Sequence, residues 1–248
     1  MLDRTWTLSV VALTLPFVLS VGCRKNADDA LAFEPAPRPV IAQSGISPSR
    51  NAQVGVTNVS SVSVHMLALL GEGNLTRVAL LNSEDGGDTF GQPVWASEPG
   101  GDVTSGGENS PAFVVTPGPM YAAWSEGQEL RFARSMTWGG SFEKPIPLNE
   151  KTAFAGYPSL GVAPNGDVYA VWIDGRDQQG DGYSYSIYLA RSTDKGANFG
   201  KNVRVASGIC PCCRPTLNFG PQGEVMVFWR HVYPGSIRDM TVAVSLDS

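Results

Sequence analysis

Basic residues are scarce in this sequence. Only 18 Lys and Arg occur among 248 residues, against 23 Asp and Glu, and they are spread along the chain. A protein that neutralises nucleic-acid phosphates needs these cations gathered in a patch or stripe. We therefore expect no nucleic-acid partner.

Long apolar runs are also scarce. Residues 5–22 form an uncharged apolar run preceded by Arg4, but this run is too short and too soon interrupted to span a membrane comfortably. It predicts an export signal over residues 1–22. The small residues directly before Cys23 resemble the lipobox of bacterial lipoproteins, which implies acylation of Cys23 and anchoring in the cell envelope, with membrane contact only through the lipid. Because Ser20 stands where the lipobox prefers Leu, ordinary cleavage with secretion, or an uncleaved anchor, stays open.

The composition does not favour helices. The chain holds 28 Gly and 18 Pro, more than helical domains usually tolerate, while 42% hydrophobic residues are enough for a substantial core. Turn-rich, all-β structure is the prediction. Residues 24–53 are rich in Ala, Pro, Ser and Asn without sustained periodicity, and they are predicted to form a flexible tether.

An eight-residue motif recurs along the rest of the chain. Ser83–Phe90 and Ser192–Phe199 both match Ser-x-Asp-x-Gly-x-(Thr/Asn)-Phe. A degenerate copy at Ser135–Phe142 has Thr137 in the Asp position, and a fourth copy begins at Ser245–Asp247. The spacing of about 50 residues is the length of one four-stranded propeller blade.

Each residue type in the motif suits a tight hairpin. Ser and Asp side chains can bond nearby backbone N–H groups, Gly can take a positive φ, and Phe can anchor the turn between sheets. We interpret the motif as a structural staple. Its members are Ser83, Asp85, Gly87, Phe90, Ser135, Gly139, Phe142, Ser192, Asp194, Gly196, Phe199, Ser245 and Asp247.

A second repeat precedes the later copies of the motif. Residues 111–124, 158–172 and 215–229 each contain a short strand, a Pro-containing turn and a second apolar strand that ends in Trp. The tryptophans are predicted to pack between blades, with sugar stacking as the alternative; they are Trp124, Trp172 and Trp229. Together the repeats predict four-stranded antiparallel blades over residues 54–97, 111–148, 157–207 and 214–248.

The eight-residue motif resembles the Asp box of sialidases. The resemblance implies a six-bladed, all-β propeller over residues 54–248, with about four blades present and the chain breaking off inside the fourth. It also implies an exported exo-glycosidase acting on sialic acid or another acidic glycan. The aromatic-Arg-Ile-Pro segment of bacterial sialidases is absent, and Asp boxes also occur in propellers of other function. The alternative is a non-catalytic, lipid-anchored propeller that binds a glycan, a protein or a metal.

Three thiols lie close together in a loop of the face opposite the motif, where function is usually placed. Cys210, Cys212 and Cys213 fall within four residues. In an exported protein this spacing is compatible with a Cys210–Cys213 disulfide, a vicinal Cys212–Cys213 bridge, or ligation of a soft metal with His231.

Arginines and acids complete the predicted face. Sialidases hold the substrate carboxylate with three arginines, so the resemblance makes Arg214, Arg230 and Arg238 candidates; pairing with neighbouring acids is the alternative. A glycosidase of this type also needs an acid, for which Asp174 and Asp177 are candidates. Solvated acids or a calcium site are the alternative for these two residues.

Overall fold

The computed structural model describes residues 40–41, 48–56, 63–72, 75–106, 108–178 and 185–245, and these residues form an all-β structure without an α-helix. Among the described residues there is no helix of the length and apolar character needed to cross a bilayer. The predicted export signal, Cys23 and Asp247 lie outside the described residues.

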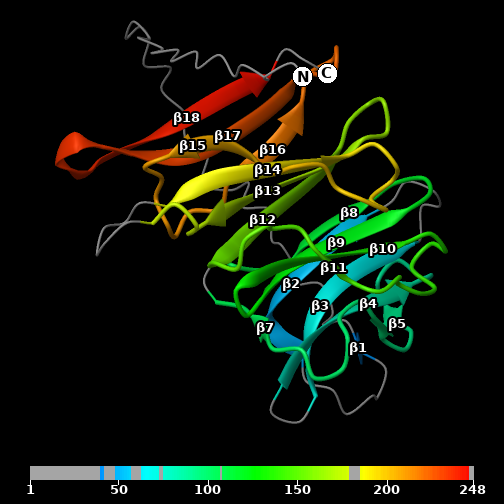
Figure 1. Cartoon of the computed structure of the whole chain (residues 1–248). Coiled ribbons are helices and arrows are strands. Elements are labelled where there is room, and N and C mark those ends of the chain that lie inside the picture. Colours follow the sequence, from blue (N-terminus) through cyan, green and yellow to red (C-terminus); the bar gives the residue numbers. More distant parts are fainter. Residues whose placement is uncertain are drawn as a thin grey trace, which may run out of the picture.

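Four antiparallel sheets follow one another along the described part of the chain, each acting as one blade (Figure 1). Blade I contains β2 (Pro48–Val56), β3 (Val64–Glu72), β4 (Leu75–Ser83) and β6 (Val94–Trp95). Blade II contains β7 (Val103–Thr104), β8 (Ala112–Val115), β9 (Met120–Glu126), β10 (Glu129–Ser135) and β11 (Ile146–Pro147). Blade III contains β12 (Ala155–Val162), β13 (Val168–Asp174), β14 (Ser186–Ser192) and β15 (Val203–Ser207). Blade IV contains β16 (Thr216–Phe219), β17 (Val225–Tyr233) and β18 (Ile237–Ser245).

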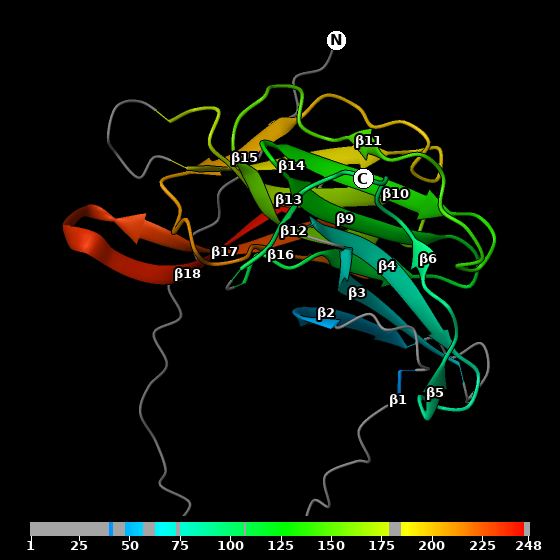
Figure 2. The same ribbon diagram turned by 90° about the horizontal axis from the view of Figure 1, so that it is seen from below.

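The blades fan around a common line. The innermost strands are β2, β8, β12 and β16, since β2 contacts β8, β8 contacts β12, and β12 contacts β16 (Figures 1 and 2). A short parallel pair, β1 (Val40–Ile41) with β5 (Thr89–Phe90), is attached beside blade I. This is the sialidase-like propeller architecture expected from the repeats.

Blade I begins earlier than predicted. Strand β2 starts at Pro48 and pairs with β3, so its first residues fall inside the stretch predicted as a tether, residues 24–53. Only the second half of β2 alternates apolar residues, at Ala52, Val54 and Val56, whereas its first residues, Pro48–Asn51, show no such pattern; pairing with β3 defines the earlier start. Blade II also gains β7, which pairs with β9 and adds a fifth strand.

The three tryptophans lie in the cores between consecutive blades, as predicted. Trp124 packs between blades I and II, Trp172 between II and III, and Trp229 between III and IV. Their exposed fractions are 1%, 0% and 2%. Burial of this extent leaves no ring face for a sugar, so the stacking alternative is excluded for all three. Each large buried aromatic also supplies an important part of the interface energy.

The repeated motif forms the predicted staple. In blade III, Ser192 Oγ accepts a hydrogen bond from Gly196 N at 2.8 Å and donates to Asp194 Oδ1 at 2.7 Å, while Asp194 accepts from Asn198 N at 2.9 Å. Blade I repeats these bonds with Ser83 and Asp85. In blade II, Thr137 replaces the Asp, and its Oγ1 accepts from Ser141 N at 3.0 Å.

The staple of blade III also docks on the preceding blade. Gly196 has φ +78°, and a Cβ added there would lie 2.8 Å from Phe132 Cζ of blade II. Arg134 of blade II donates to the carbonyls of Asp194 and Lys195. The glycine therefore serves both the left-handed turn and the close approach of two blades.

Candidate functional site

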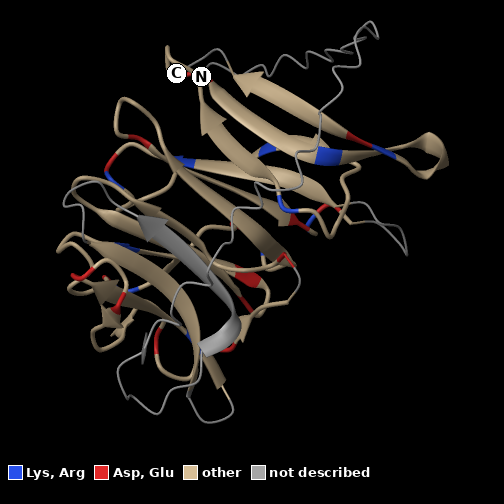
Figure 3. Ribbon diagram, turned by 180° about the vertical axis from the view of Figure 1, so that it is seen from behind, with Lys and Arg blue, Asp and Glu red and all other residues tan. Residues whose placement is uncertain are grey.

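The face opposite the staples is built from the loops between the second and third strands and from the crossings that join consecutive blades. Lys and Arg lie scattered among Asp and Glu over the molecule (Figure 3). The crossing from β15 to β16 carries the three thiols and returns to the sheet through a bond from Cys210 N to Arg230 O of 2.9 Å. Because charge is not gathered in one patch, the candidate site is described by its individual side-chain clusters.

The three cysteine sulfurs form a compact triangle. The Sγ atoms of Cys210 and Cys212 lie 3.4 Å apart, those of Cys210 and Cys213 3.4 Å, and those of Cys212 and Cys213 3.8 Å. Cys210 is buried and Cys212 is exposed, so the triangle has an inner and an outer side. All three are free thiols. Such a group of sulfurs has the donor chemistry that soft metal ions prefer.

The pKa values of Cys210 and Cys212 are shifted in opposite directions. Burial opposes ionisation of Cys210, but hydrogen bonds from the Cys212 backbone and from the other two thiols, with the nearby Arg238, lower the pKa of Cys210 below its usual range. Hydrogen bonds to Cys210 and Cys213 raise the pKa of Cys212 to about 11. Cys210 is thus the favoured thiolate, and a thiolate is the form that binds metal.

His231 does not belong to the thiol triangle. Its Nδ1 lies 3.5 Å from Trp229 Nε1 and accepts that indole hydrogen bond, and its ring meets Tyr233 edge-on at 4.5 Å. Along a strand successive side chains point to opposite faces. Arg230 therefore faces the cysteines, with Nη1 3.9 Å from Cys213 Sγ, while His231 faces blade III. The prediction that His231 joins the cysteines as a metal ligand is therefore wrong.

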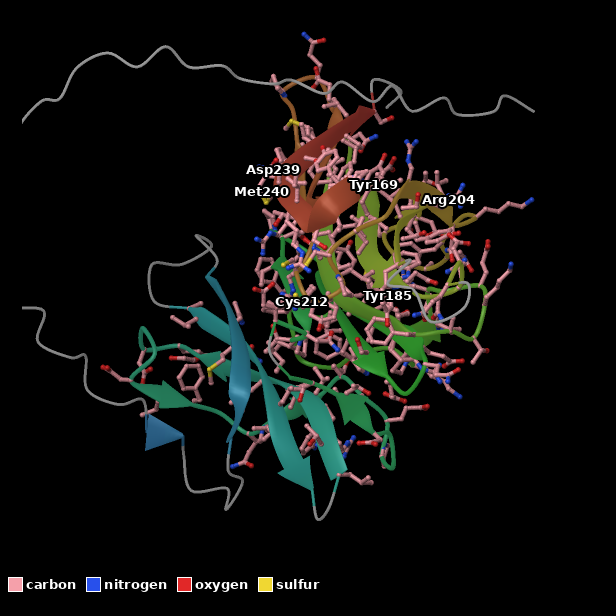
Figure 4. The ribbon with its side chains drawn as sticks, turned by 90° about the vertical axis from the view of Figure 1, so that its left-hand side faces the viewer. Tyr169, Tyr185, Arg204, Cys212, Asp239 and Met240 are labelled. Carbon is pink, nitrogen blue, oxygen red and sulfur yellow. The ribbon has the colours of Figure 1, made fainter. Side chains whose placement is uncertain are left out.

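The arginines divide into one structural and two exposed side chains. Arg214 donates from Nη2 to the Ser110 hydroxyl at 3.0 Å and to the Ser110 carbonyl, and burial lowers its pKa. Arg230 and Arg238 are exposed and lie on one face of the β17–β18 hairpin, because Arg230 pairs with Met240 and Val232 with Arg238. In Figure 4, Met240 and Cys212 both lie to the left of Arg204.

Two further side chains of this face were not predicted. Tyr157 has a left-handed backbone, with φ +56°, and its N–H donates to Asn109 Oδ1 at 2.8 Å. Burial raises the pKa of Tyr157, and the nearby Cys212, Glu108 and Cys213 raise it further. A non-glycine residue held at positive φ is costly and often marks a functional position. No sequence pattern distinguishes Tyr157, because the contacts come from crossings about 50 residues apart.

Asp174 is fully buried in an internal ion pair. It is 0% exposed, accepts from Trp172 Nε1 at 2.7 Å, and receives both Nε and Nη2 of Arg176 at 2.9 and 2.7 Å. The backbone N–H of Arg176 also donates to Asp174 Oδ1, at 2.8 Å. A carboxylate so enclosed and fully bonded has no path to a substrate. Its placement argues for a structural role instead of the predicted catalytic one.

Asp177 is held on the outer part of blade III. Its Oδ2 accepts from Ser186 Oγ and Tyr188 Oη, both at 2.8 Å, and from Arg204 Nη1 at 3.5 Å. Burial alone would raise the pKa of Asp177, but these bonds outweigh it and lower the pKa. An acid that stays ionised is a poor general acid, because protonating a leaving group requires a raised pKa. Asp181 is outside the described residues.

A cavity of about 870 Å³ lies on the staple side of blade III, at a surface where one blade packs on the next. It is lined in part by Leu189 and Arg191. These residues correspond in the repeat to Phe132 and Arg134 of blade II, which are covered by Gly196 of the next staple. The volume alone therefore does not mark a ligand site.

No protein-family model matches this sequence, and no curated protein matches it. Solved structures do resemble it in fold. A protein of unknown function from Dyadobacter fermentans DSM 18053 has a TM-score of 0.55 at 17% identity, over 73% of this chain and 50% of that chain. The phage phi92 endosialidase has a TM-score of 0.56 at 9% identity, over 75% and 34%. A mutant of Trypanosoma rangeli sialidase displaying trans-sialidase activity has a TM-score of 0.50 at 16% identity, over 79% and 35%.

This likeness shows the fold. The chain is a sialidase-like β-propeller in architecture, with antiparallel blades of the kind that glycosidases use. It spans half the length of the first of these structures and about a third of the other two. At such low identity the activity of those proteins does not carry over with the fold.

Proposed function

We propose that this chain is an exported sialidase-like propeller that binds an acidic glycan on the face opposite its staples. The observation that supports this most directly is the pair Arg230 and Arg238, exposed on one face of a hairpin. Among the described residues, no carboxylate forms an ion pair with either of them. A guanidinium without an acidic partner can take a ligand carboxylate through two parallel hydrogen bonds.

The fold likeness agrees with this proposal, since two of the similar structures are named as an endosialidase and a sialidase. Export and anchoring through Cys23 belong to the proposal as well. The catalytic form, an exo-glycosidase, needs an acid able to protonate the leaving group. Because Asp174 and Asp177 are both engaged in internal bonds, the described geometry favours binding over hydrolysis.

Calorimetric titration of the chain with sialyllactose, and with neutral lactose as the comparison, tests the proposal. We expect saturable binding of sialyllactose, weakened at least tenfold by Arg230→Ala/Arg238→Ala. Lys144→Ala removes one positive charge next to the staple of blade II and should leave binding unchanged. Equal binding of lactose, or an Arg230→Ala/Arg238→Ala chain that binds as well as the parent, would contradict it. Release of fluorophore from a sialoside would show that the protein hydrolyses its ligand and is an enzyme, not only a binding protein.

A second candidate function is storage of a soft metal ion at the thiol triangle. A tetrahedral ion with metal–sulfur bonds of about 2.3 Å places its ligands about 3.8 Å apart. The three sulfur separations in this loop, 3.4 to 3.8 Å, come close to that value. Cys210, Cys212 and Cys213 would supply three ligands, and the exposed side at Cys212 leaves a fourth position for solvent or ligand.

Metal content after dialysis of the reduced chain tests this candidate. With zinc or copper(I) as the probe, we expect one ion per chain, and its loss in Cys212→Ser/Cys213→Ser. The substitution Cys212→Ser alone should weaken retention less than the double change. A reduced chain that retains no metal would contradict the metal site, and a chain that before reduction is lighter by two hydrogens would assign the cluster to a disulfide.

A further inference from the structure

The loop that carries the three thiols is a tight turn. The Cys213 N–H donates to the Cys210 carbonyl at 3.4 Å, with Pro211 and Cys212 as the two central residues. Proline is favoured at the first central position, because its fixed φ matches the backbone needed there. The closeness of the three sulfurs therefore follows from the local backbone.

Both ends of this turn are anchored to other parts of the fold. Before the turn, Cys210 N donates to Arg230 O of β17 at 2.9 Å. After it, Arg214 N donates to Glu108 Oε2 at 3.0 Å, and the Arg214 guanidinium donates to the Ser110 hydroxyl at 3.0 Å. The sulfur triangle is thus held in place before a ligand arrives, and a preformed site avoids the cost of ordering its loop on binding.

The triangle offers three sulfurs and no other ligand atom of the usual kinds. Among the residues that the structure describes, no His, Asp or Glu belongs to this group. The polar group beside it is Arg230 Nη1, 3.9 Å from Cys213 Sγ, which is a hydrogen-bond donor and cannot ligate an ion. Such a site suits an ion that forms three bonds better than one that needs four.

The spacing of the sulfurs also favours an ion with three bonds. With bonds of about 2.3 Å, sulfurs 3.4 Å apart subtend about 95° at a bound ion, and sulfurs 3.8 Å apart about 111°. A tetrahedral ion holds its ligands at about 109°. Trivalent arsenic and antimony carry a lone pair, which compresses their three bond angles below the tetrahedral value. Two of the three angles in this loop are compressed in that way.

We propose that the thiol triangle binds trivalent arsenic or antimony as a three-sulfur complex. The inference rests on the second candidate function, a soft-ion site, and names its ion class. In arsenite, three arsenic–oxygen bonds break and three arsenic–sulfur bonds form, while each hydroxyl leaves as water with the proton of one thiol. Arsenic stays trivalent, so no oxidant or reductant takes part. The ligand enters on the exposed side at Cys212, and Cys210, 2% exposed, closes the inner side.

Titration of the reduced full chain with arsenite, followed by non-denaturing mass spectrometry, tests the proposal. We expect one arsenic per chain and a mass increase equal to one arsenic less three hydrogens. Arsenite should displace bound zinc, whereas an equal concentration of zinc should not displace arsenite. Loss of fewer than three hydrogens, or displacement of arsenite by zinc, would overturn the proposal. Retention of zinc without binding of arsenite would overturn this inference alone and leave the soft-metal candidate standing.

Single substitutions show whether all three sulfurs take part. Cys212→Ser and Cys213→Ser should each weaken arsenite binding at least tenfold, and Cys212 is exposed, so its change should not disturb folding. Phenylarsine oxide forms only two sulfur bonds and should still bind both variants. Cys23→Ser makes the same change at the fourth cysteine of the sequence and should leave arsenite binding unchanged. Arsenite binding that survives Cys212→Ser, or that is lost in Cys23→Ser, would overturn the proposal.

Discussion

The two faces of this propeller use repetition in opposite ways. On the staple face, the turns of blades I and III make the same hydrogen bonds from Ser and Asp, and even Thr137 of blade II reproduces part of the pattern. On the other face, a shared position two residues after Trp holds Glu126, Asp174 or His231. Each accepts the indole N–H, yet their surroundings differ completely. Repeated geometry therefore marks what folds the blades, and departures from it mark where chemistry can differ.

The largest expected effect is on the non-repeating face of blade III. Asp174→Ala removes one partner of a buried ion pair and leaves Arg176 unpaired, which is expected to cost about 3–5 kcal/mol in the free energy of unfolding. Chemical denaturation measures this loss. Replacing both partners, in Asp174→Ala/Arg176→Met, should restore much of it, because no buried charge is left alone. A loss below about 1 kcal/mol for Asp174→Ala would refute the structural role given to this acid.

The next largest effect separates turn geometry from blade contact on the staple face. Gly196→Ala places a methyl group 2.8 Å from Phe132 at a positive φ, whereas Gly166→Ala has the same kind of backbone, φ +88°, and no neighbour within 4 Å. We expect a loss of about 2–4 kcal/mol at Gly196 and about 1–2 kcal/mol at Gly166. Equal losses in denaturation would show that the staple only turns the chain and does not dock on blade II.

A smaller effect is expected from making the repeat more regular. Thr137→Asp restores the acid of the motif in blade II, where the carboxylate can accept from Ser141 N and from Ser135 Oγ as Asp194 does in blade III. A gain of about 2–4 °C in the melting temperature is expected, the size that one hydrogen bond gives in a domain of this length. Thr137→Ala is the opposite control and should lower the melting temperature. If Thr137→Asp also lowers it, blade II does not share the geometry of blade III.

The smallest effect is confined to acid pH. Hydrogen bonds from Asn198 and Ser192 lower the pKa of Asp194 from 3.8 to about 2 in the folded chain. Because the folded pKa is depressed, the stability that this group contributes is present above about pH 4 and is lost as the pH falls towards 2. Asp194→Asn should therefore flatten the melting temperature between pH 4 and pH 2. Asp85→Asn should act in the same direction, since the pKa of Asp85 is also lowered by its turn; an unchanged curve in both would contradict the assigned bonds.

The sequence predicted most of the fold because its signals are local. The motif residues bond partners two to four positions away, so their types and spacing identify the turn, and a spacing of about 50 residues identifies the blade. Blade III was predicted over residues 157–207, and its four strands run from Ala155 to Ser207. The start of strand β2 was predicted too late, because its first residues, Pro48–Asn51, are polar and carry no periodic signal.

The candidate site was predicted less well than the fold. The sequence identified the cysteine cluster and the arginines of the right face, but it also joined His231 to the cysteines and assigned catalysis to Asp174. Strand alternation and burial separate these groups, and neither can be read from residue type alone.

By itself, the sequence determined the blade repeat, the staples and the face on which to look for function, since each depends on contacts within a few residues. Only the tertiary structure decided which polar side chains are consumed by the fold and which stay available. Arg214 and Ser110 meet across 104 residues, and Arg230 and Cys213 meet where a crossing returns to a strand. The cavity of about 430 Å³ between β15 and blade IV likewise exists only where two blades face each other, because its walls come from separate repeats.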